Sequence, residues 1–357
     1  MRVLILGLLL WSGVAGAQER FENFVGIRSL GMGGTATAVV NDETALLANP
    51  AALGKLRTYI VTIADPEISA NATVLSAAGG RSTADLFSPQ GLASALAQNQ
   101  DKPYHTKIQL FPSFVVPNFG FGVFAKYSYD FEYVSSRTAG QRLRVDYTND
   151  YAFVLGYSLR LFDGRVKIGV AGRIMNRVEA HTYIDETSTS IGWGDFVSEG
   201  GAIAGDGGII LTAPWKFLPT LAATIHDIGR TTFNQGEGVF YKNGRKPADA
   251  PQTVDVGIAL FPIHANNLRS TFTVEYKDVL TYSEETDQMR RIHAGLEINF
   301  ADFMFFRGGM NQRYWTAGGE LAIQKFQFQA ATYGEEIGTP TAPREDRRFI
   351  GKFSFRF

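Results

Sequence analysis

The chain has 357 residues with 34 Lys and Arg against 35 Asp and Glu, a net charge of −1, and it contains no cysteine. A near-neutral charge without a basic block argues against nucleic acid as a partner, because phosphate binding requires clustered Lys and Arg. The lack of cysteine excludes disulfide scaffolds, thiol nucleophiles and cysteine zinc sites. With 38 Gly, 27 Phe and 14 Tyr, the composition favours a protein rich in β-sheet.

Residues 1–17 have the pattern of a signal peptide: a cationic Arg2, an apolar run over residues 3–11, and the small residues Ala15, Gly16 and Ala17. The alternative is a membrane anchor, which needs about twenty apolar residues, so we expect cleavage after Ala17. No later apolar run is long enough to span as a helix. The exported chain is therefore predicted to be either soluble outside the cytoplasm or a membrane-embedded barrel.

Residues 18–57 precede the first predicted strand, and their small residues are unsuited to lipid contact. Gly31, Gly33 and Gly34 let the backbone turn sharply and approach other backbone closely. Asp42 or Asn41 is expected to cap a short helix through residues 43–47, which ends at Asn49-Pro50. A phosphate-binding loop is a poorer interpretation, because no strand precedes the glycines and the spacing of a dinucleotide fingerprint is incomplete.

The stretch Gly26 to Leu53 resembles the opening of the FadL-type outer-membrane proteins, the long-chain fatty-acid and hydrocarbon transporter superfamily that includes PorV-like scaffold proteins of a secretion system. The resemblance implies a fourteen-stranded outer-membrane barrel whose lumen is plugged by residues 18–57. The plug either only seals the pore or also contacts a ligand. The match extends over about thirty residues. Within them, the matching positions are Arg28, Leu30, Gly31, Met32, Gly33, Gly34, Asp42, Ala45, Asn49, Pro50 and Ala51.

Residues 58–357 contain repeated runs with a period of two, in which apolar and polar residues alternate. A soluble sandwich has the same alternation, but several runs exceed ten residues, whereas soluble strands average about five or six and tilted membrane strands need about nine to eleven. We therefore predict an all-β transmembrane antiparallel barrel of about fourteen strands, at 58–64, 107–116, 119–134, 143–161, 165–184, 201–213, 219–228, 253–261, 269–278, 289–300, 303–311, 314–322, 325–334 and 347–357.

The connections alternate in length, as they do in bacterial barrels with short periplasmic turns and longer external loops. The short ones are centred on 117–118, 162–164, 214–218, 262–268, 301–302 and 323–324. The long ones include 65–106, 185–200, 229–252, 279–288 and 335–346, and only the external connection 312–313 is compact. In the first long loop, residues 84–99 place Leu86, Leu92 and Leu96 at roughly helical spacing, which predicts one or two short helices.

The last predicted strand puts Phe353, Phe355 and the terminal Phe357 on one face. An aromatic terminal strand of this kind resembles the strand that outer-membrane barrels present to the barrel-assembly machinery. We expect that machinery, outer-membrane lipid and lipopolysaccharide to be partners of the chain.

No catalytic or metal motif accompanies the five histidines, which are scattered along the chain. His293 shares the predicted lumen face with Glu297 and is interpreted as an ordinary lumen residue. We expect no enzyme activity, no metal and no cofactor, although a triad assembled across strands stays open as an alternative.

The resemblance implies passive uptake of hydrophobic small molecules such as long-chain fatty acids. The side chains that are candidates for ligand contact are Phe24, Leu30 and Met32 on the plug side and Leu86, Phe87, Leu92 and Leu96 in the first external loop. The alternative is a non-catalytic scaffold or shuttle, similar to the PorV-like members, that holds a secreted protein at the cell surface.

Overall fold

The computed structural model describes residues 19, 22–78, 102–136, 140–185, 196–234, 238–241, 244–280 and 287–357. The predicted signal peptide at 1–17 and the predicted loop helices at 84–99 lie outside the described residues. So do four of the predicted ligand contacts, Leu86, Phe87, Leu92 and Leu96.

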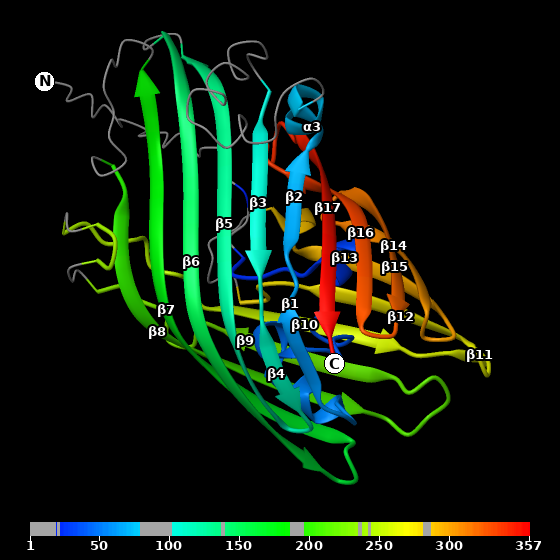
Figure 1. Cartoon of the computed structure of the whole chain (residues 1–357). Coiled ribbons are helices and arrows are strands. Elements are labelled where there is room, and N and C mark those ends of the chain that lie inside the picture. Colours follow the sequence, from blue (N-terminus) through cyan, green and yellow to red (C-terminus); the bar gives the residue numbers. More distant parts are fainter. Residues whose placement is uncertain are drawn as a thin grey trace, which may run out of the picture.

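The described strands form one antiparallel sheet that closes on itself (Figure 1). Its 17 segments make fourteen barrel strands, because β1 with β2 and β3 with β4 each form one interrupted strand, and β11 extends the hairpin of β10 and β12. The segments are β1 (Ile60–Ala64), β2 (Glu67–Asn71), β3 (Tyr104–Leu110), β4 (Ser113–Val116), β5 (Phe119–Ser136), β6 (Gly140–Leu161), β7 (Val166–Asp185), β8 (Ser198–Thr212), β9 (Thr220–His226), β10 (Thr253–Leu260), β11 (Ile263–Ala265), β12 (Leu268–Tyr276), β13 (Ile292–Phe300), β14 (Met304–Asn311), β15 (Tyr314–Ile323), β16 (Phe326–Glu336) and β17 (Glu345–Arg356). The predicted barrel and strand number are confirmed.

Two of the predicted strands were wrong in detail. The run 107–116 is split into β3 and β4 by Phe111-Pro112, and the first strand does not end at residue 64 but resumes as β2 after Asp65-Pro66. Residues 67–71 therefore belong to the wall and not to the first external loop. Proline lacks the N–H that a central strand donates, so both interruptions fall at a proline.

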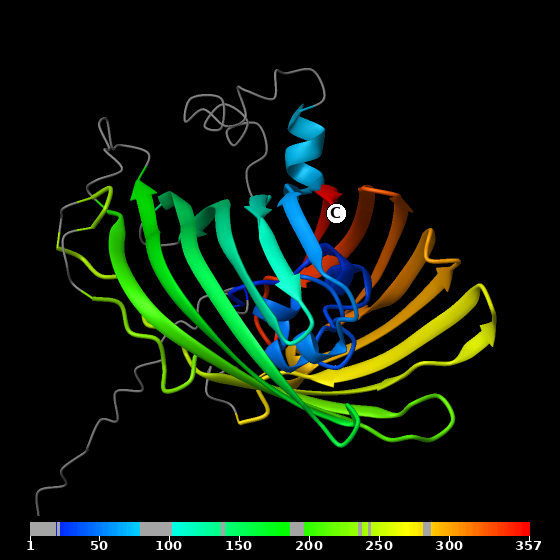
Figure 2. The ribbon, with the colours of Figure 1, turned by 60° about the horizontal axis from the view of Figure 1, so that its bottom comes forward.

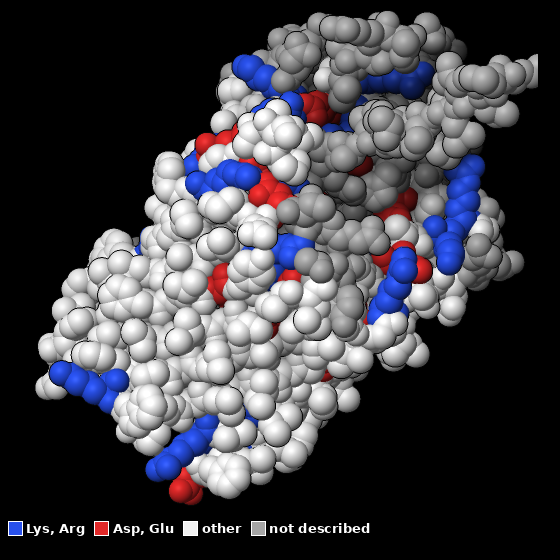
Figure 3. All heavy atoms as spheres, turned by 180° about the vertical axis from the view of Figure 1, so that it is seen from behind, with Lys and Arg blue, Asp and Glu red and all other residues white. Residues whose placement is uncertain are grey.

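The outer face of the wall is apolar, as a lipid-facing surface requires. Phe153, Ile174 and Ile203 project outward, with Ile203 exposed at 80%. In the lower part of the view, Figure 3 shows a broad face almost free of charged side chains, with Lys and Arg, and Asp or Glu beside them, at its lower edge. Charged side chains on the opposite face of the strands are buried, among them Lys126, Glu132, Glu275, Glu297 and Arg307. None of the helices within the described residues combines the length and apolarity that a membrane crossing would need.

The barrel is much taller on one side than on the other. Strands β5, β6 and β7 have 18, 22 and 20 residues, whereas β14 has 8. These long strands form the tall side of the molecule in Figure 1. The short turns lie together at one end of the barrel, the end away from the long connections. In one of these turns, Phe162, Asp163 and Gly164 adopt positive φ angles of 52°, 56° and 80°, which reverse the chain tightly.

The helical segments are short: α1 (Ile27–Gly31), α2 (Ala45–Ala48), the 3-10 segment η1 (Pro50–Lys55), α3 (Ala72–Ala78) and η3 (Gln288–Arg291). Figure 2 shows the N-terminal segment with α1, α2 and η1 inside the barrel. We call residues 22–57 the plug. Helix α2 ends directly before Asn49-Pro50, as predicted, but it begins at Ala45, and its N-cap residue Thr44 makes no side-chain cap hydrogen bond. The predicted capping by Asp42 or Asn41 is therefore wrong, and the Asp42 carboxylate instead accepts the Thr44 N–H at 3.0 Å in the turn before the helix.

The plug approaches the wall most closely where the wall carries glycine. A Cβ at Gly169 of β7 would overlap the backbone of Pro50 and Ala51, and one at Gly208 of β8 would overlap the Asn49 side chain. Asn49 also orders the plug internally, because its Nδ2 donates to the Thr37 carbonyl at 2.8 Å and its Oδ1 accepts the Ala51 N–H at 3.1 Å. The Asn-Pro-Ala turn therefore has a fixed seat on the wall.

We predict that Gly169→Val prevents this seating, because overpacking against backbone cannot be relieved by a rotamer change. We expect a loss of at least about 1–3 kcal/mol in the free energy of unfolding, measured by thermal unfolding in detergent and by heat-modifiable migration on gels. Gly172→Val is the matched control on the same strand, since its Cβ would meet no atom within 4 Å. Equal effects of the two substitutions would contradict the seat.

Candidate functional site

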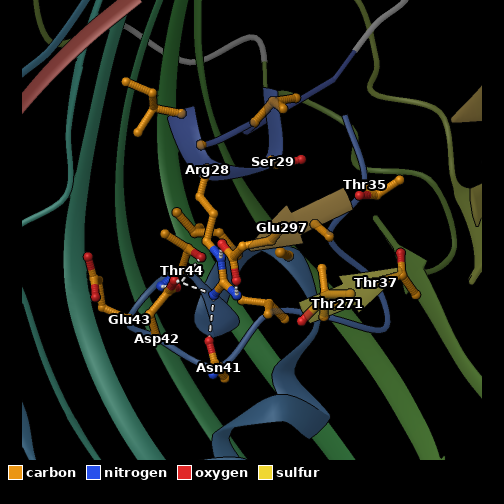
Figure 4. Close-up of a pocket in the computed structure, with 18 of the residues that line it drawn as sticks. Arg28, Ser29, Thr35, Thr37, Asn41, Asp42, Glu43, Thr44, Thr271 and Glu297 are labelled. Atoms are coloured by element: carbon orange, nitrogen blue, oxygen red, sulfur yellow. Dashed lines mark hydrogen bonds and ion pairs between the residues drawn. The ribbon is translucent and has the colours of Figure 1, made fainter. Parts of the chain in front are cut away.

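The plug is joined to the wall by a chain of ion pairs that begins at Arg28. Its guanidinium donates to both carboxylate oxygens of Glu297 on β13, at 3.0 and 2.9 Å, and to Asp42 of the plug at 3.3 Å. Figure 4 shows Arg28 pointing from α1 toward Glu297, Asp42 and Asn41. Glu297 also accepts from Arg307 at 2.7 Å. The network thus runs from the plug into the adjacent wall strands, and Arg307 extends it to Glu320 on β15.

Asp42 is ionised within this network. Burial alone would raise the pKa of Asp42, but the Arg28 guanidinium and the Thr44 hydroxyl outweigh it and hold that pKa below its usual range. A charged Asp42 keeps Arg28 compensated on the plug side while Glu297 compensates it on the wall side.

Three carboxylates converge on one lysine where the wall is interrupted. The Lys352 Nζ of β17 lies 3.6 Å from Glu43 of the plug, 3.3 Å from Asp65 and 3.2 Å from Glu67. All four side chains are buried. Because Asp65 and Glu67 flank Pro66, Lys352 connects the plug to both sides of the break between β1 and β2.

An aromatic cluster occupies the lumen beside the same interruption. Phe111, between β3 and β4, turns inward and packs against Phe124 of β5 and Phe24 of the plug, with ring centroids 5.6–6.4 Å apart. The Asp65 carboxylate accepts the Phe111 N–H at 2.6 Å. We call Phe24, Phe111 and Phe124 the aromatic gate, because their rings fill the contact between the plug and the interrupted wall.

Two of the cavities that border the plug bear on the site. The larger has a volume of about 1140 Å³ and is lined by Phe24, Arg28, Asp42, Glu297 and Phe261 among others. The smaller, of about 250 Å³, lies above the plug among ionised side chains that include Lys107, Arg177 and Arg348. The described lumen therefore offers a large mixed cavity next to the aromatic gate and a small ionic one.

The predicted contacts on the plug side fall in different surroundings. Phe24 lines the large cavity, whereas Leu30 lines the small one and packs with Ile27 and Tyr333. Met32 is fully buried against Gly295 and Gly309 and lines neither cavity. The glycines of the same segment also contact the wall. Gly31 lies against Gly318 of β15. Gly33 and Gly34 have φ angles of 70° and 83°, and the His293 Nδ1 donates to the Gly33 carbonyl at 2.8 Å.

One group of side chains within the described residues has the spacing of a metal site: Glu19, His105 and Asp130. Arg348 already binds the Glu19 carboxylate at 3.0 and 2.9 Å and lies 3.6 Å from Asp130. A guanidinium in this position repels a metal cation, so the group fits an ion-pair network better than a metal centre.

Sequence reasoning missed Phe111 and Lys352 as site residues. Pro66 and Pro112 were the available signals, because proline within an apolar strand indicates an edge, a bulge or a break.

We predict that Arg28→Ala loosens the plug, because it leaves Asp42 without its cation and Glu297 with only Arg307. Removing one partner of a buried ion pair costs about 3–5 kcal/mol, which corresponds to at least about a hundredfold faster hydrogen exchange at plug amides such as that of Leu30. Arg269→Ala is the control, since Arg269 and Asp302 form a pair at 3.4 Å with both side chains more than half exposed. Unchanged exchange in Arg28→Ala would show that the ion pair does not hold the plug.

No protein-family model matches the chain, and no curated protein matches its sequence. Solved structures do match it over nearly its whole length. The CymD monoaromatic hydrocarbon channel is 10% identical with a TM-score of 0.56, covering 93% of this chain and 97% of that one. The toluene transporter TodX of Pseudomonas putida is 12% identical with a TM-score of 0.53, covering 92% and 96%.

The toluene transporter TbuX of Ralstonia pickettii is 14% identical with a TM-score of 0.53, covering 93% of this chain and 98% of that one. All three are named as channels or transporters. At these identities the likeness concerns the fold. The chain therefore has the fold of these three proteins, in agreement with the barrel that the resemblance of its N-terminal segment to the FadL-type proteins implies.

Proposed function

We propose that the chain is an outer-membrane channel for passive uptake of hydrophobic small molecules. A ligand enters from the external side, reaches the aromatic gate, and leaves either past the plug through the large cavity or sideways through the interrupted wall. The protein supplies no chemical step. It offers apolar surface whose burial is worth about 25 cal/mol per Å² and a route across the lipopolysaccharide layer.

The observation that carries this proposal is the double interruption of the wall beside the plug. Pro66 and Pro112 lie in neighbouring strands, and Phe111 between β3 and β4 packs on Phe24 of the plug. When the Phe111 ring moves away from Phe24, an apolar ligand takes its place in the cluster. The gate can therefore open without exposing a charge.

The cavity volume is compatible with two classes of hydrophobic substrate, and the solved neighbours favour one of them. Pockets for small molecules measure about 300–1,000 Å³, and the cavity of about 1140 Å³ accommodates a monoaromatic hydrocarbon or a folded fatty acid. The neighbours named for toluene and monoaromatic hydrocarbons favour the former. Competition between labelled toluene and labelled oleate for uptake into cells that produce the chain separates the two.

The scaffold role remains the second candidate function. It is favoured by the ionic character of the described lumen above the plug, where Arg177, Arg348 and Asp130 lie around a cavity of about 250 Å³. A secreted protein that co-purifies at equal stoichiometry, together with no uptake of either labelled ligand, would replace the channel proposal with this one.

We predict that locking the plug to the wall stops uptake through the large cavity. A Cβ at Gly318 would lie 3.2 Å from the Gly31 Cα, and one at Gly31 would lie 3.5 Å from the Gly318 Cα, so thiols introduced at the two positions would be within reach of each other. In Gly31→Cys/Gly318→Cys, oxidation is expected to lower the uptake rate at least tenfold and reduction to restore it. The natural chain has no cysteine, so no other thiol interferes.

The two single-cysteine variants are the controls, and each should transport equally under oxidising and reducing conditions. If the oxidised double variant transports at the full rate, the plug stays in place during uptake and the ligand uses the interrupted wall. If no variant and no natural protein raises uptake above that of empty cells, the channel proposal is wrong.

A further inference from the structure

The end of the barrel that carries the short turns is basic at its exposed rim, although the whole chain has a net charge of −1. Six exposed Lys and Arg side chains lie in or beside these turns, against two exposed Asp side chains, Asp163 and Asp302. The basic residues are Arg57, Arg160, Arg165, Lys216, Arg269 and Lys325. The rim thus has a local charge of +4, and the remainder of the chain must be acidic.

Most of these cations have no carboxylate partner. Among the described residues, only Arg269 of the six forms an ion pair with a carboxylate, that of Asp302 at 3.4 Å. Lys216 and Lys325 instead lie over aromatic rings, with Nζ 5.0 Å from the centroid of Phe217 and 4.1 Å from that of Phe357. Their positive charges are therefore available to an external anion.

Large aromatic side chains alternate with the basic residues at the same rim. Trp215 is exposed at 71% next to Lys216, and Phe162 at 74% near Arg165. Tryptophan and other aromatic rings settle at the boundary between hydrocarbon and headgroups. These rings continue the apolar outer wall directly, so the charges beside them lie at the depth of the lipid phosphates.

We propose that this rim binds the phosphates of anionic phospholipids in the periplasmic leaflet. The short turns of bacterial barrels face the periplasm, where the leaflet consists of phospholipids, and each Lys or Arg near an anionic membrane surface contributes about fivefold (about 1 kcal/mol) to binding. The lipid-facing wall supplies the adjoining interface, and the excess of positive charge supplies the complementarity. The inference does not depend on which ligand the channel carries.

The test compares two variants of equal charge. Arg165→Gln/Lys216→Gln removes two rim cations, and Arg230→Gln/Lys246→Gln removes two exposed cations from the region between β9 and β10 at the opposite end. Detergent-purified protein is mixed with equal amounts of phosphatidylglycerol and phosphatidylethanolamine, and the retained lipids are counted by native mass spectrometry.

The natural protein and the opposite-end variant are expected to retain phosphatidylglycerol preferentially, and the rim variant to lose at least about tenfold of that preference. High salt should weaken the preference in the natural protein, since phosphate contacts with exposed cations are screened. Heat-modifiable migration on gels checks that both variants are folded.

Three results would each overturn the proposal: equal retention of the two lipids by the natural protein, an undiminished preference in the rim variant, or an equal loss in the opposite-end variant. A fourth is displacement of phosphatidylglycerol by millimolar inorganic phosphate, which would identify a site for free anions. If the natural protein shows no lipid preference but binds an acidic periplasmic protein through the rim, the rim is a protein-docking surface instead.

Discussion

The buried charges of the inner wall are the constraint on which the rest of the structure depends. A barrel of fourteen strands encloses more space than its own side chains fill, and charges in that space need partners because isolation from water is costly. The plug provides them: Arg28 neutralises Glu297, and Glu43 shares Lys352 with Asp65 and Glu67. These contacts require the plug to lie close to the wall. Glycine at wall positions such as Gly169 and Gly208 permits this, because a Cβ there would overlap the plug.

The same ion pairs limit how far the plug can move. Withdrawing Arg28 from Glu297 breaks a buried ion pair, which costs about 3–5 kcal/mol. At the interrupted wall, Pro66 and Pro112 donate no ladder hydrogen bond, but their carbonyls accept the N–H groups of Phe353 at 3.4 Å and Val123 at 2.9 Å. Separating the rings of Phe24 and Phe111 costs only apolar contact, and an apolar ligand replaces that contact. The lateral route proposed above would leave the ion pairs of the plug in place.

Much of the fold could be predicted because its signals are local. The period-two alternation shows which residues face lipid, and turns such as Phe162-Asp163-Gly164 carry the composition that short reversals need. His293 and Glu297 were placed on the lumen face on this basis alone. The interruption at Pro112 was overlooked because the apolar alternation continues on both sides of it, although proline argues against a continuous central strand.

The pairings within the site could not be predicted, because they join residues far apart in the chain. Arg28 and Glu297 are separated by 269 positions, and nothing in either segment alone specifies the other. Lys352 is one of several inward charges on its strand, and it becomes distinctive only when Glu43, Asp65 and Glu67 are brought around it. Single-sequence reasoning identifies which face a charge occupies, but the partner depends on barrel closure and register.

The distribution of charge also connects the site to the membrane. Inside the barrel, opposite charges cancel in pairs, so the lumen contributes little net charge, while the rim at the short turns keeps an excess of cations beside Trp215 and Phe162. A wall that is apolar all round can shift along the membrane normal at little cost, and interfacial aromatic and basic side chains fix its depth. In the orientation proposed above, with the rim at the lipid phosphates, the break at Pro66 and Pro112 lies among Ile63, Ile68 and Phe353, whose side chains are exposed on the outer wall. A hydrophobic ligand that leaves through that break therefore enters a phase in which it is already soluble.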